Sequence, residues 1–511
     1  MKIANPRLQS IFNYLSKLNQ TAYKDEFLIP NNVLSKNPFF SNLTNNYLLK
    51  NKPDKAGFFF KTRKLLRYYI RNFSWLVAFT GKSLAHYLSC QNYQPHPENK
   101  NLILIDSTIY VKRTTNENSF EDILFPGLLK VLKDLKIPFA ITSVLYDSGN
   151  LMQLFRAFRF FKKNKIPVLT EYQIIGGIDF LRMLLFLLFY PASLTRFIKG
   201  LGASYEDQLL THALWESSDD IVASSYMRLL FGKRLCALPA TKIKCISWYE
   251  NQARHKAFYR GLHNLPGKVT IFGAQLLIWP ESVLNIHTDE EEINSGLVPE
   301  KVIVNGSYYL MNNSRIDYRV GPSFRYKKLL HFNISPKNTK HILAVLSAWE
   351  SEIESAISFL VQFPENIELR LKFHPSTNIK KYKNRLPANI KIVDDDLHEC
   401  FQTAKLVMGR STGTLVEAIS LGIPTIVIDN NELCHDFIPS NTEGKGLIWD
   451  KAFKVSHALE LIKHFEKNLI MKSNEIKDLA KTYRSIFFCN PTSDKIIEAF
   501  ELTKDHSSVK L

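Results

Sequence analysis

Three short motifs between residues 372 and 429 bring together groups that bind phosphate. The sequence KFHPS ends a predicted strand, GRSTGT joins a strand to a helix, and IPTIVID forms the next strand. A helix that begins behind Ser411, Thr412 and Gly413 makes free N–H groups, hydroxyls and a helix dipole converge on one point. We therefore predict a phosphate site there, with Glu417 placed to reach a ribose diol. A simple helix cap at Ser411 or Thr412 stays open as the alternative.

Two carboxylates end predicted parallel strands, at the edge where doubly wound folds bind ligands. Glu250 follows the apolar run ISWY, and Asp106 ends NLILID. We expect Glu250 to be the first candidate for a general base or a residue that orients the acceptor, and Asp106 to be the second candidate base. A helix-capping carboxylate is the alternative for Glu250. Arg325 and Arg410 are candidates for contact with anionic groups, although a salt-bridged arginine is the alternative for each.

The acids Asp394, Asp395 and Asp396 are expected to cap a helix rather than to bind a metal ion. The sequence contains no P-loop, GxGxxG, HExxH or GxSxG motif, so kinase, dehydrogenase, zinc-protease and hydrolase activities have no support. We predict neither a metal site nor a cofactor.

From about residue 100 onward, strand-like and helix-like segments alternate, which predicts βαβ units around parallel sheets. One series, with a predicted helix over 120–135, runs to residue 275; a second begins at residue 341 and is preceded by a predicted linker around 317–322. The predicted fold class is therefore α/β, with two doubly wound Rossmann-like domains facing a cleft. The expected parts are a basic, mostly helical extension (1–94), an N-terminal domain (95–320), a C-terminal domain (321–490) and a tail (491–511).

Positive charge is concentrated in the extension. The chain has a net charge of +18, and residues 1–94 hold 14 Lys/Arg and 3 Asp/Glu, a difference of +11. This excess favours an anionic partner, and the mixture of basic and aromatic residues in 61–82 is typical of a helix at a membrane interface. A basic helix that only packs on the domain is an equal alternative. No zinc-finger or RRM signature is present, so no nucleic-acid partner is expected.

The apolar run Phe180–Tyr190 is expected to be a buried or membrane-dipping helix. Its 11 residues are fewer than the roughly 20 that span a bilayer, so no transmembrane segment is predicted. The N-terminus does not resemble a signal peptide, and the six cysteines form no CxxC pair, which favours a reducing compartment. We predict a cytoplasmic protein at the inner face of the cytoplasmic membrane.

The three motifs resemble those of GT-B glycosyltransferases, most closely bacterial surface-carbohydrate enzymes and the CMP-sugar-using sialyl- and Kdo-transferases. The latter share an HP motif and a Ser-Ser or Ser-Thr motif, which correspond here to His374-Pro375 and Ser411-Thr412. The resemblance implies that His374 faces the donor phosphate or cytidine and that Ser411 and Thr412 bind the phosphate.

Residues 205–430 also resemble a bacterial surface-carbohydrate biosynthesis family. The resemblance is carried by the segments SWYENQARHKAFYRGL, KVTIFGAQ, VPEKVIVNG, RVGPSFRY and KFHP. Within these segments, Asn251, Gln275 and Arg325 are candidates for contacts with the acceptor or elsewhere in the cleft. Some relatives have a His where Gln275 or Leu276 stands, so the role of that His is not carried over.

These resemblances imply a metal-independent glycosyltransferase that moves a Kdo-like or other nonulosonic acid from a CMP donor to a surface glycan or lipid-linked acceptor. The partners would be the nucleotide sugar, the glycan acceptor and an anionic membrane, in lipopolysaccharide or capsule synthesis. The alternatives are a UDP- or GDP-sugar transferase, a sugar-nucleotide epimerase of the same fold and a non-enzymatic basic binding protein.

Overall fold

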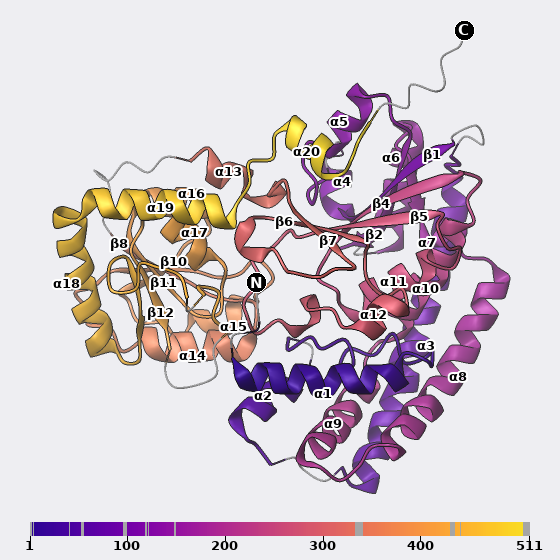
Figure 1. The fold of residues 1–511 in the computed structure, drawn as a ribbon, viewed down its shortest axis with the longest axis horizontal. Coiled ribbons are helices and arrows are strands. Elements are labelled where there is room, and N and C mark those ends of the chain that lie inside the picture. The colour runs from indigo at the N-terminus through magenta and orange to yellow at the C-terminus, as the bar shows by residue number, and fades with distance from the viewer. Residues whose placement is uncertain are drawn as a thin grey trace.

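The protein contains two α/β domains and a helical region below them (Figure 1). The structure is a computed structural model. It describes residues 3, 5–39, 41–52, 56–95, 100–117, 120, 122–147, 150–332, 341–429, 435–439 and 441–503.

The N-terminal domain is built on a seven-stranded parallel sheet. Its strand order is β3-β2-β1-β4-β5-β6-β7. All neighbours are parallel, and successive strands are added on one side of β1 up to β3 and on the other side from β4 onward. The strands are β1 (Asn101–Tyr110), β2 (Phe139–Tyr146), β3 (Val168–Thr170), β4 (Lys242–Trp248), β5 (Val269–Ala274), β6 (Lys301–Val304) and β7 (Asp317–Val320). Helices connect them: α4 (Val111–Glu117), α5 (Leu128–Asp134), α6 (Leu151–Lys163), α7 (Glu171–Ile174), α8 (Gly177–Lys199), α9 (Tyr205–Glu216), α10 (Ala223–Cys236), α11 (Ala253–Leu262) and α12 (Glu290–Asn294).

The C-terminal domain repeats this order in a six-stranded parallel sheet, β10-β9-β8-β11-β12-β13. Its strands are β8 (His341–Val345), β9 (Leu369–Lys372), β10 (Ile390–Ile392), β11 (Ala404–Gly409), β12 (Thr425–Ile428) and β13 (Trp449–Ala452). Its helices are α13 (Lys327–Leu330), α14 (Glu350–Leu360), α15 (Lys380–Lys383), α16 (Leu397–Thr403), α17 (Thr414–Ser420), α18 (Val455–Met471) and α19 (Ser473–Phe487). The two doubly wound sheets confirm the predicted α/β, GT-B type of fold.

Two local predictions are wrong. The helix predicted over 120–135 is confined to α5, because the Asp122 carboxylate accepts the N–H groups of Leu124 and Phe125 in a turn and Gly127 has a left-handed φ of 91°. The predicted linker at 317–322 contains β7, which is the edge strand of the first sheet.

The chain crosses between the domains twice, and the two crossings are bonded to each other. Ser323 N–H donates to the Cys489 carbonyl, and Cys489 N–H donates to the Ser323 hydroxyl, both at 2.9 Å. Beyond this point the segment predicted as a tail contains α20 (Ser493–Ala499). Ile496 and Phe500 pack in the N-terminal core with Phe272, so the last described residues belong to that domain's packing.

The N-terminal extension is packed into the N-terminal domain. It contains α1 (Pro6–Ala22), α2 (Leu43–Leu49) and α3 (Phe58–Ser89), and its residues 8–34 contribute nine buried apolar side chains to the main core: Leu8, Ile11, Leu15, Ala22, Tyr23, Leu28, Ile29, Val33 and Leu34. Lys36, Lys256, Asp289 and Glu292 form a buried charge cluster that joins the extension to the domain. Lys36 lies 3.0 Å from both acids, and Glu292 also pairs with Lys256.

The predicted apolar helix at 180–190 extends over the 23 residues of α8. Pro191 lies within it, contrary to a helix end at that position. By length and composition α8 is the one helix of the described chain that is apolar enough to cross a membrane, which corrects the prediction that no segment qualifies. One face of α8 is nevertheless buried in the protein core at Met183, Phe186 and Tyr190.

Candidate functional site

The carboxyl ends of both sheets open into one cavity of about 570 Å³. Glu250 enters it from the loop after β4, where the strand order of the first sheet reverses. Residues 345–349, from the last residue of β8 onward, and residues 411–414 after β11 enter from the corresponding position of the second sheet. Such switch points are where doubly wound folds bind ligands.

The loop between β11 and α17 presents backbone donors to this cavity. The N–H groups of Thr412 and Gly413 have no hydrogen-bond partner among the described residues, whereas the Thr414 N–H is bonded to the Thr412 hydroxyl at 3.3 Å. A Cβ added at Gly413 would lie 3.1 Å from Cβ of Ile278 in the N-terminal domain. Glycine therefore allows the loop to approach the opposite wall closely.

Arg410 and Ser411 fix this loop through hydrogen bonds to Glu352 on α14. The Arg410 guanidinium, 1% exposed, donates to Glu352 at 2.6 Å, and the Ser411 hydroxyl donates to the same carboxylate oxygen at 2.8 Å. The Ser411 hydroxyl also accepts the His435 N–H, and Ser411 has a left-handed φ of 49°. The structure therefore places Arg410 outside the cavity, and the Ser411 side chain shapes the loop.

His374 and Pro375 line the cavity after β9. Nδ1 of His374 accepts the Ser376 N–H at 3.2 Å and lies 2.7 Å from the Ser376 hydroxyl. Since Nδ1 is an acceptor, the proton of the neutral ring is on Nε2, which makes no hydrogen bond within the described chain. Partial desolvation, together with the charge of Arg325, lowers the pKa of His374.

Two carboxylates and one arginine occupy the middle of the site. Burial raises the pKa of Glu250 to about 7, although Arg325 and Arg254 oppose the shift. Burial likewise raises the pKa of Glu417, on α17, to about 7, again against Arg325. Arg325 itself is exposed to the cavity and makes no ion pair with any described residue. A guanidinium thus faces carboxylates whose pKa values lie near neutrality, and all three come from different segments.

Three other predicted residues lie outside this cavity. Asp106 is 6% exposed. Its carboxylate pairs with Arg228 at 2.6 Å and accepts a hydrogen bond from the Ser247 hydroxyl, so both of its oxygens are bonded inside the domain. Asn251 donates to the Asn285 carbonyl, and the Gln275 side chain bonds the Leu277 carbonyl and the Asn305 N–H. These two side chains hold the loops that form the N-terminal wall.

The N-terminal extension brings to the cavity two residues that no sequence motif predicts there. Asn37 and Phe39 line it, and the Phe39 ring stacks on Trp349 of the C-terminal domain with centroids 4.1 Å apart. His435 packs edge-on against the Phe39 ring at 4.7 Å. Because more than 300 residues separate Phe39 from Trp349, no local pattern relates them.

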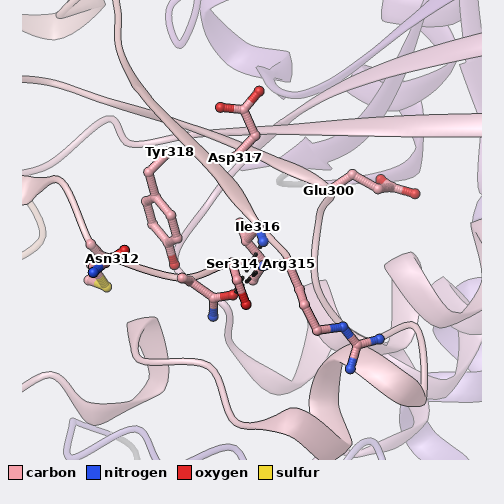
Figure 2. A pocket seen from close by; sticks show the side chains of 9 residues that line it. Glu300, Asn312, Ser314, Arg315, Ile316, Asp317 and Tyr318 are labelled. Carbon is pink, nitrogen blue, oxygen red and sulfur yellow. Dashed lines mark hydrogen bonds between the residues drawn. The ribbon is translucent and has the colours of Figure 1, made fainter.

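A second, open hollow of about 400 Å³ lies between Glu300 and residues 311–318. Figure 2 shows that the charged groups of Glu300, Arg315 and Asp317 point away from one another. Arg315 donates to Asn294, and the Asn313 side chain accepts N–H groups of its own loop. This hollow has no converging set of polar groups and contains no predicted site residue.

The described residues contain no group of three or more His, Cys, Asp or Glu placed to hold a metal ion. Asp396 accepts the His398 N–H at 3.0 Å and caps α16, as the sequence predicts.

No family model matches the sequence, and no curated protein matches it. Among solved structures, the chain is similar to the UDP-GlcNAc 2-epimerase of Methanocaldococcus jannaschii, with 12% identity, 78% of this chain and 99% of that chain covered, and a TM-score of 0.41. The glycosyltransferase SnogD of Streptomyces nogalater has 12% identity, coverages of 78% and 98%, and a TM-score of 0.38. The wall teichoic acid polymerase TagF has 10% identity, coverages of 88% and 100%, and a TM-score of 0.35. At these values the fold class rests on the strand order, and the function on the site.

His374→Ala is expected to weaken nucleotide binding by about 10- to 100-fold, since a hydrogen bond to a charged phosphate contributes about 1.5 to 3 kcal/mol. The His374 side chain is exposed, so the free energy of unfolding should stay unchanged. Isothermal titration with nucleotide measures the affinity, and urea denaturation is the control. Unchanged affinity in a folded variant would remove His374 from the phosphate site.

Proposed function

We propose that this chain is a glycosyltransferase that uses a nucleotide-activated sugar. The observation that carries the proposal is the interdomain cavity, which has phosphate-binding groups on one side and an ionisable carboxylate on the other. The N–H groups of Thr412 and Gly413, the His374 ring and Arg325 would bind the donor phosphate. Glu417 would accept hydrogen bonds from the ribose. In this proposal these groups take the place of a metal ion, so EDTA is expected to leave activity unchanged.

Glu250 would act as the general base on the acceptor hydroxyl. A catalytic base works best with a pKa near the working pH, and burial brings the pKa of Glu250 to about 7. Arg325, whose charge opposes the burial-driven rise in the pKa of Glu250 and Glu417, would interact with negative charge that develops on the departing phosphate.

For the donor we propose a CMP-linked Kdo-like or other nonulosonic acid, and for the acceptor a bacterial surface glycan or lipid-linked glycan. The support is the resemblance of His374-Pro375 and Ser411-Thr412 to CMP-sugar-using enzymes. A nonulosonic acid carries a carboxylate, and Arg325 is a cation in the cavity that no described acid pairs with. We place the activity at the cytoplasmic face of the membrane.

CMP is expected to raise the thermal midpoint of the protein more than UDP or GDP does at equal concentration. A ligand that binds only the folded state stabilises it by RT ln(1 + [L]/Kd), so at 100 Kd the gain is about 2.7 kcal/mol. Differential scanning fluorimetry with the three nucleotides measures the ranking, and His374→Ala is the control for binding at this site. An equal or larger shift with UDP would overturn the CMP assignment.

A sugar-nucleotide epimerase is the second candidate, because the cavity holds two carboxylates, Glu250 and Glu417, with pKa values near 7. Such a pair could remove a proton from one face of a sugar and return another. An epimerase needs no acceptor and introduces deuterium from D₂O into the sugar. Mass spectrometry of nucleotide sugars incubated without acceptor distinguishes the two functions.

A further inference from the structure

The outer faces of α3 and α8 are apolar although neither face is covered by protein. On α8 the uncovered side chains are 39 to 63% exposed and comprise Ile178, Leu181, Leu184, Leu185, Leu188 and Phe189. Residues 178, 181, 185 and 188 are spaced by three and four, so they form one stripe along the helix. The opposite face is buried at Met183, Phe186 and Tyr190. The helix is therefore apolar on both sides, whereas a helix at a protein–water surface is polar on its outer side.

The same pattern occurs on α3. Six of its exposed apolar side chains share one face and are 57 to 88% exposed: Phe59, Leu66, Ile70, Val77, Leu84 and Leu88. Their spacings are seven, four, seven, seven and four residues, so they form a stripe over the full length of the helix. The buried residues Tyr68, Asn72, Leu76 and Phe79 lie on the other side.

The two helices pack against each other in opposite directions. The Tyr68 ring stacks on the Tyr190 ring with centroids 5.5 Å apart, and the Phe79 ring packs against the Phe180 ring at 5.8 Å. A later residue of α3 thus pairs with an earlier residue of α8, so the two helices are antiparallel. Figure 1 shows both helices at the lower right of the molecule, away from the C-terminal domain. These contacts use the inner faces and leave both stripes uncovered.

The charges on this helix pair have almost a single sign. Together α3 and α8 carry nine Lys/Arg and one Asp/Glu: Lys61, Arg63, Lys64, Arg67, Arg71, Lys82, Arg182, Arg196 and Lys199 against Asp179. Arg63, Arg67, Arg196 and Lys199 make no ion pair with any residue that the structure describes. Apolar stripes bordered by unpaired cations complement a bilayer with anionic headgroups, because the side chains enter the acyl boundary while the cations meet the headgroups.

We propose that the outer faces of α3 and α8 dock this protein onto an anionic lipid bilayer. The α8 helix lies at the interface and does not span the bilayer, because its inner face is buried in the protein core and is joined to it by hydrogen bonds such as Asn31 to Tyr190. The proposal concerns attachment alone and does not depend on the sugar or nucleotide that the cavity binds.

Point substitutions test this surface better than removal of residues 1–94, since that segment supplies part of the main core. One variant combines Leu181→Glu, Leu185→Glu and Leu188→Glu on α8, and a second combines Leu66→Glu, Ile70→Glu and Val77→Glu on α3. The matched control is Ile470→Glu with Met471→Glu, because these side chains are 83% and 70% exposed at the end of α18. Flotation with vesicles of phosphatidylcholine and phosphatidylglycerol measures binding, and circular dichroism checks that each variant is folded.

Wild type and the α18 control are expected to float with the mixed vesicles, and the α8 and α3 variants to bind at least about 100-fold more weakly, as expected for three lost apolar side chains. Arg63→Gln with Arg67→Gln should reduce binding by about 30-fold and weaken its dependence on salt. Undiminished flotation of both stripe variants would overturn the proposal. So would a wild type that ignores vesicles but forms a dimer which the α8 variant disrupts, because a second copy would then cover the face.

Discussion

Glu250→Gln is expected to lower kcat by about 100- to 10,000-fold while leaving the affinity for the donor nucleotide nearly unchanged. The Glu250 side chain lies on the N-terminal side of the cavity, whereas His374, Thr412, Gly413 and Glu417, which are assigned to the nucleotide, lie on the C-terminal side. Glutamine keeps the size and the acceptor oxygen that Gln252 contacts at 2.5 Å, but it cannot take a proton. A transfer assay and a nucleotide titration on the same preparation separate the two effects.

The pH profile gives this variant a second, independent readout. A base must be ionised, so kcat/KM of the wild type should fall as pH decreases through about 7, the pKa to which burial raises Glu250. The residual kcat/KM of Glu250→Gln should not show this fall on the acid side of the profile.

Stability should change in the opposite direction to activity. Because the pKa of Glu250 is raised in the folded state, its contribution to stability is present below the unfolded value near 4.5 and is lost as pH rises to about 7. Above neutrality Glu250→Gln removes a charge that the fold disfavours and should therefore be at least as stable as wild type.

Asp106→Asn is the matched control. It loses the ion pair with Arg228, so it is expected to lose stability but to keep the fall of kcat/KM at acid pH. Near-native turnover of Glu250→Gln would exclude Glu250 as the base.

The local sequence pattern was sufficient to predict the fold and the strands and loops that position the residues of the cavity. Alternating apolar segments predicted the parallel strands, and the polar residues at their carboxyl ends predicted which loops meet in the cavity. Glu250, His374, Thr412 and Glu417 all line it, because each directly follows or lies close behind a strand that the apolar pattern marks. Their catalytic and binding roles stay predictions.

Side-chain direction was much harder to predict than element position. Arg410 is one residue past β11, and this placement alone does not distinguish a guanidinium in the cavity from one buried against Glu352 on α14. Asp106 lies inside β1, which continues to residue 110, so its carboxylate faces Arg228 of α10 and not the cleft. In both cases the partner lies on another element, and the sequence gives no indication of the pairing.

The role of the extension was predicted from its composition alone, and composition does not reveal what the segment packs against. Its apolar residues at 8–34 enter the domain core, and the next few residues reach the cavity. Lys36 fixes this path, since its amino group is paired with Asp289 and Glu292 and donates to the His287 carbonyl at 3.1 Å. One lysine thus sets the position of Asn37 and Phe39 in the site.

Glu292→Gln is expected to lower the free energy of unfolding by about 3 to 5 kcal/mol. In the folded protein Lys36, Lys256, Asp289 and Glu292 balance as two positive and two negative charges, and the side chains of Lys36, Lys256 and Glu292 are all 0% exposed. Removal of the Glu292 charge leaves two buried ammonium groups with one carboxylate, so the desolvation of the second is no longer offset. Urea denaturation measures the loss.

Glu290→Gln on the same helix is the matched control, because Glu290 is exposed and should change stability by less than about 0.5 kcal/mol. Because Lys36 directly precedes the residues that line the cavity, Glu292→Gln should also weaken nucleotide binding, although Glu292 does not line that cavity. Protease sensitivity of residues 23–39 should rise in parallel, since the extension loses its buried attachment. Wild-type stability in Glu292→Gln would mean that the apolar residues of the extension, without this charge cluster, hold Phe39 against Trp349.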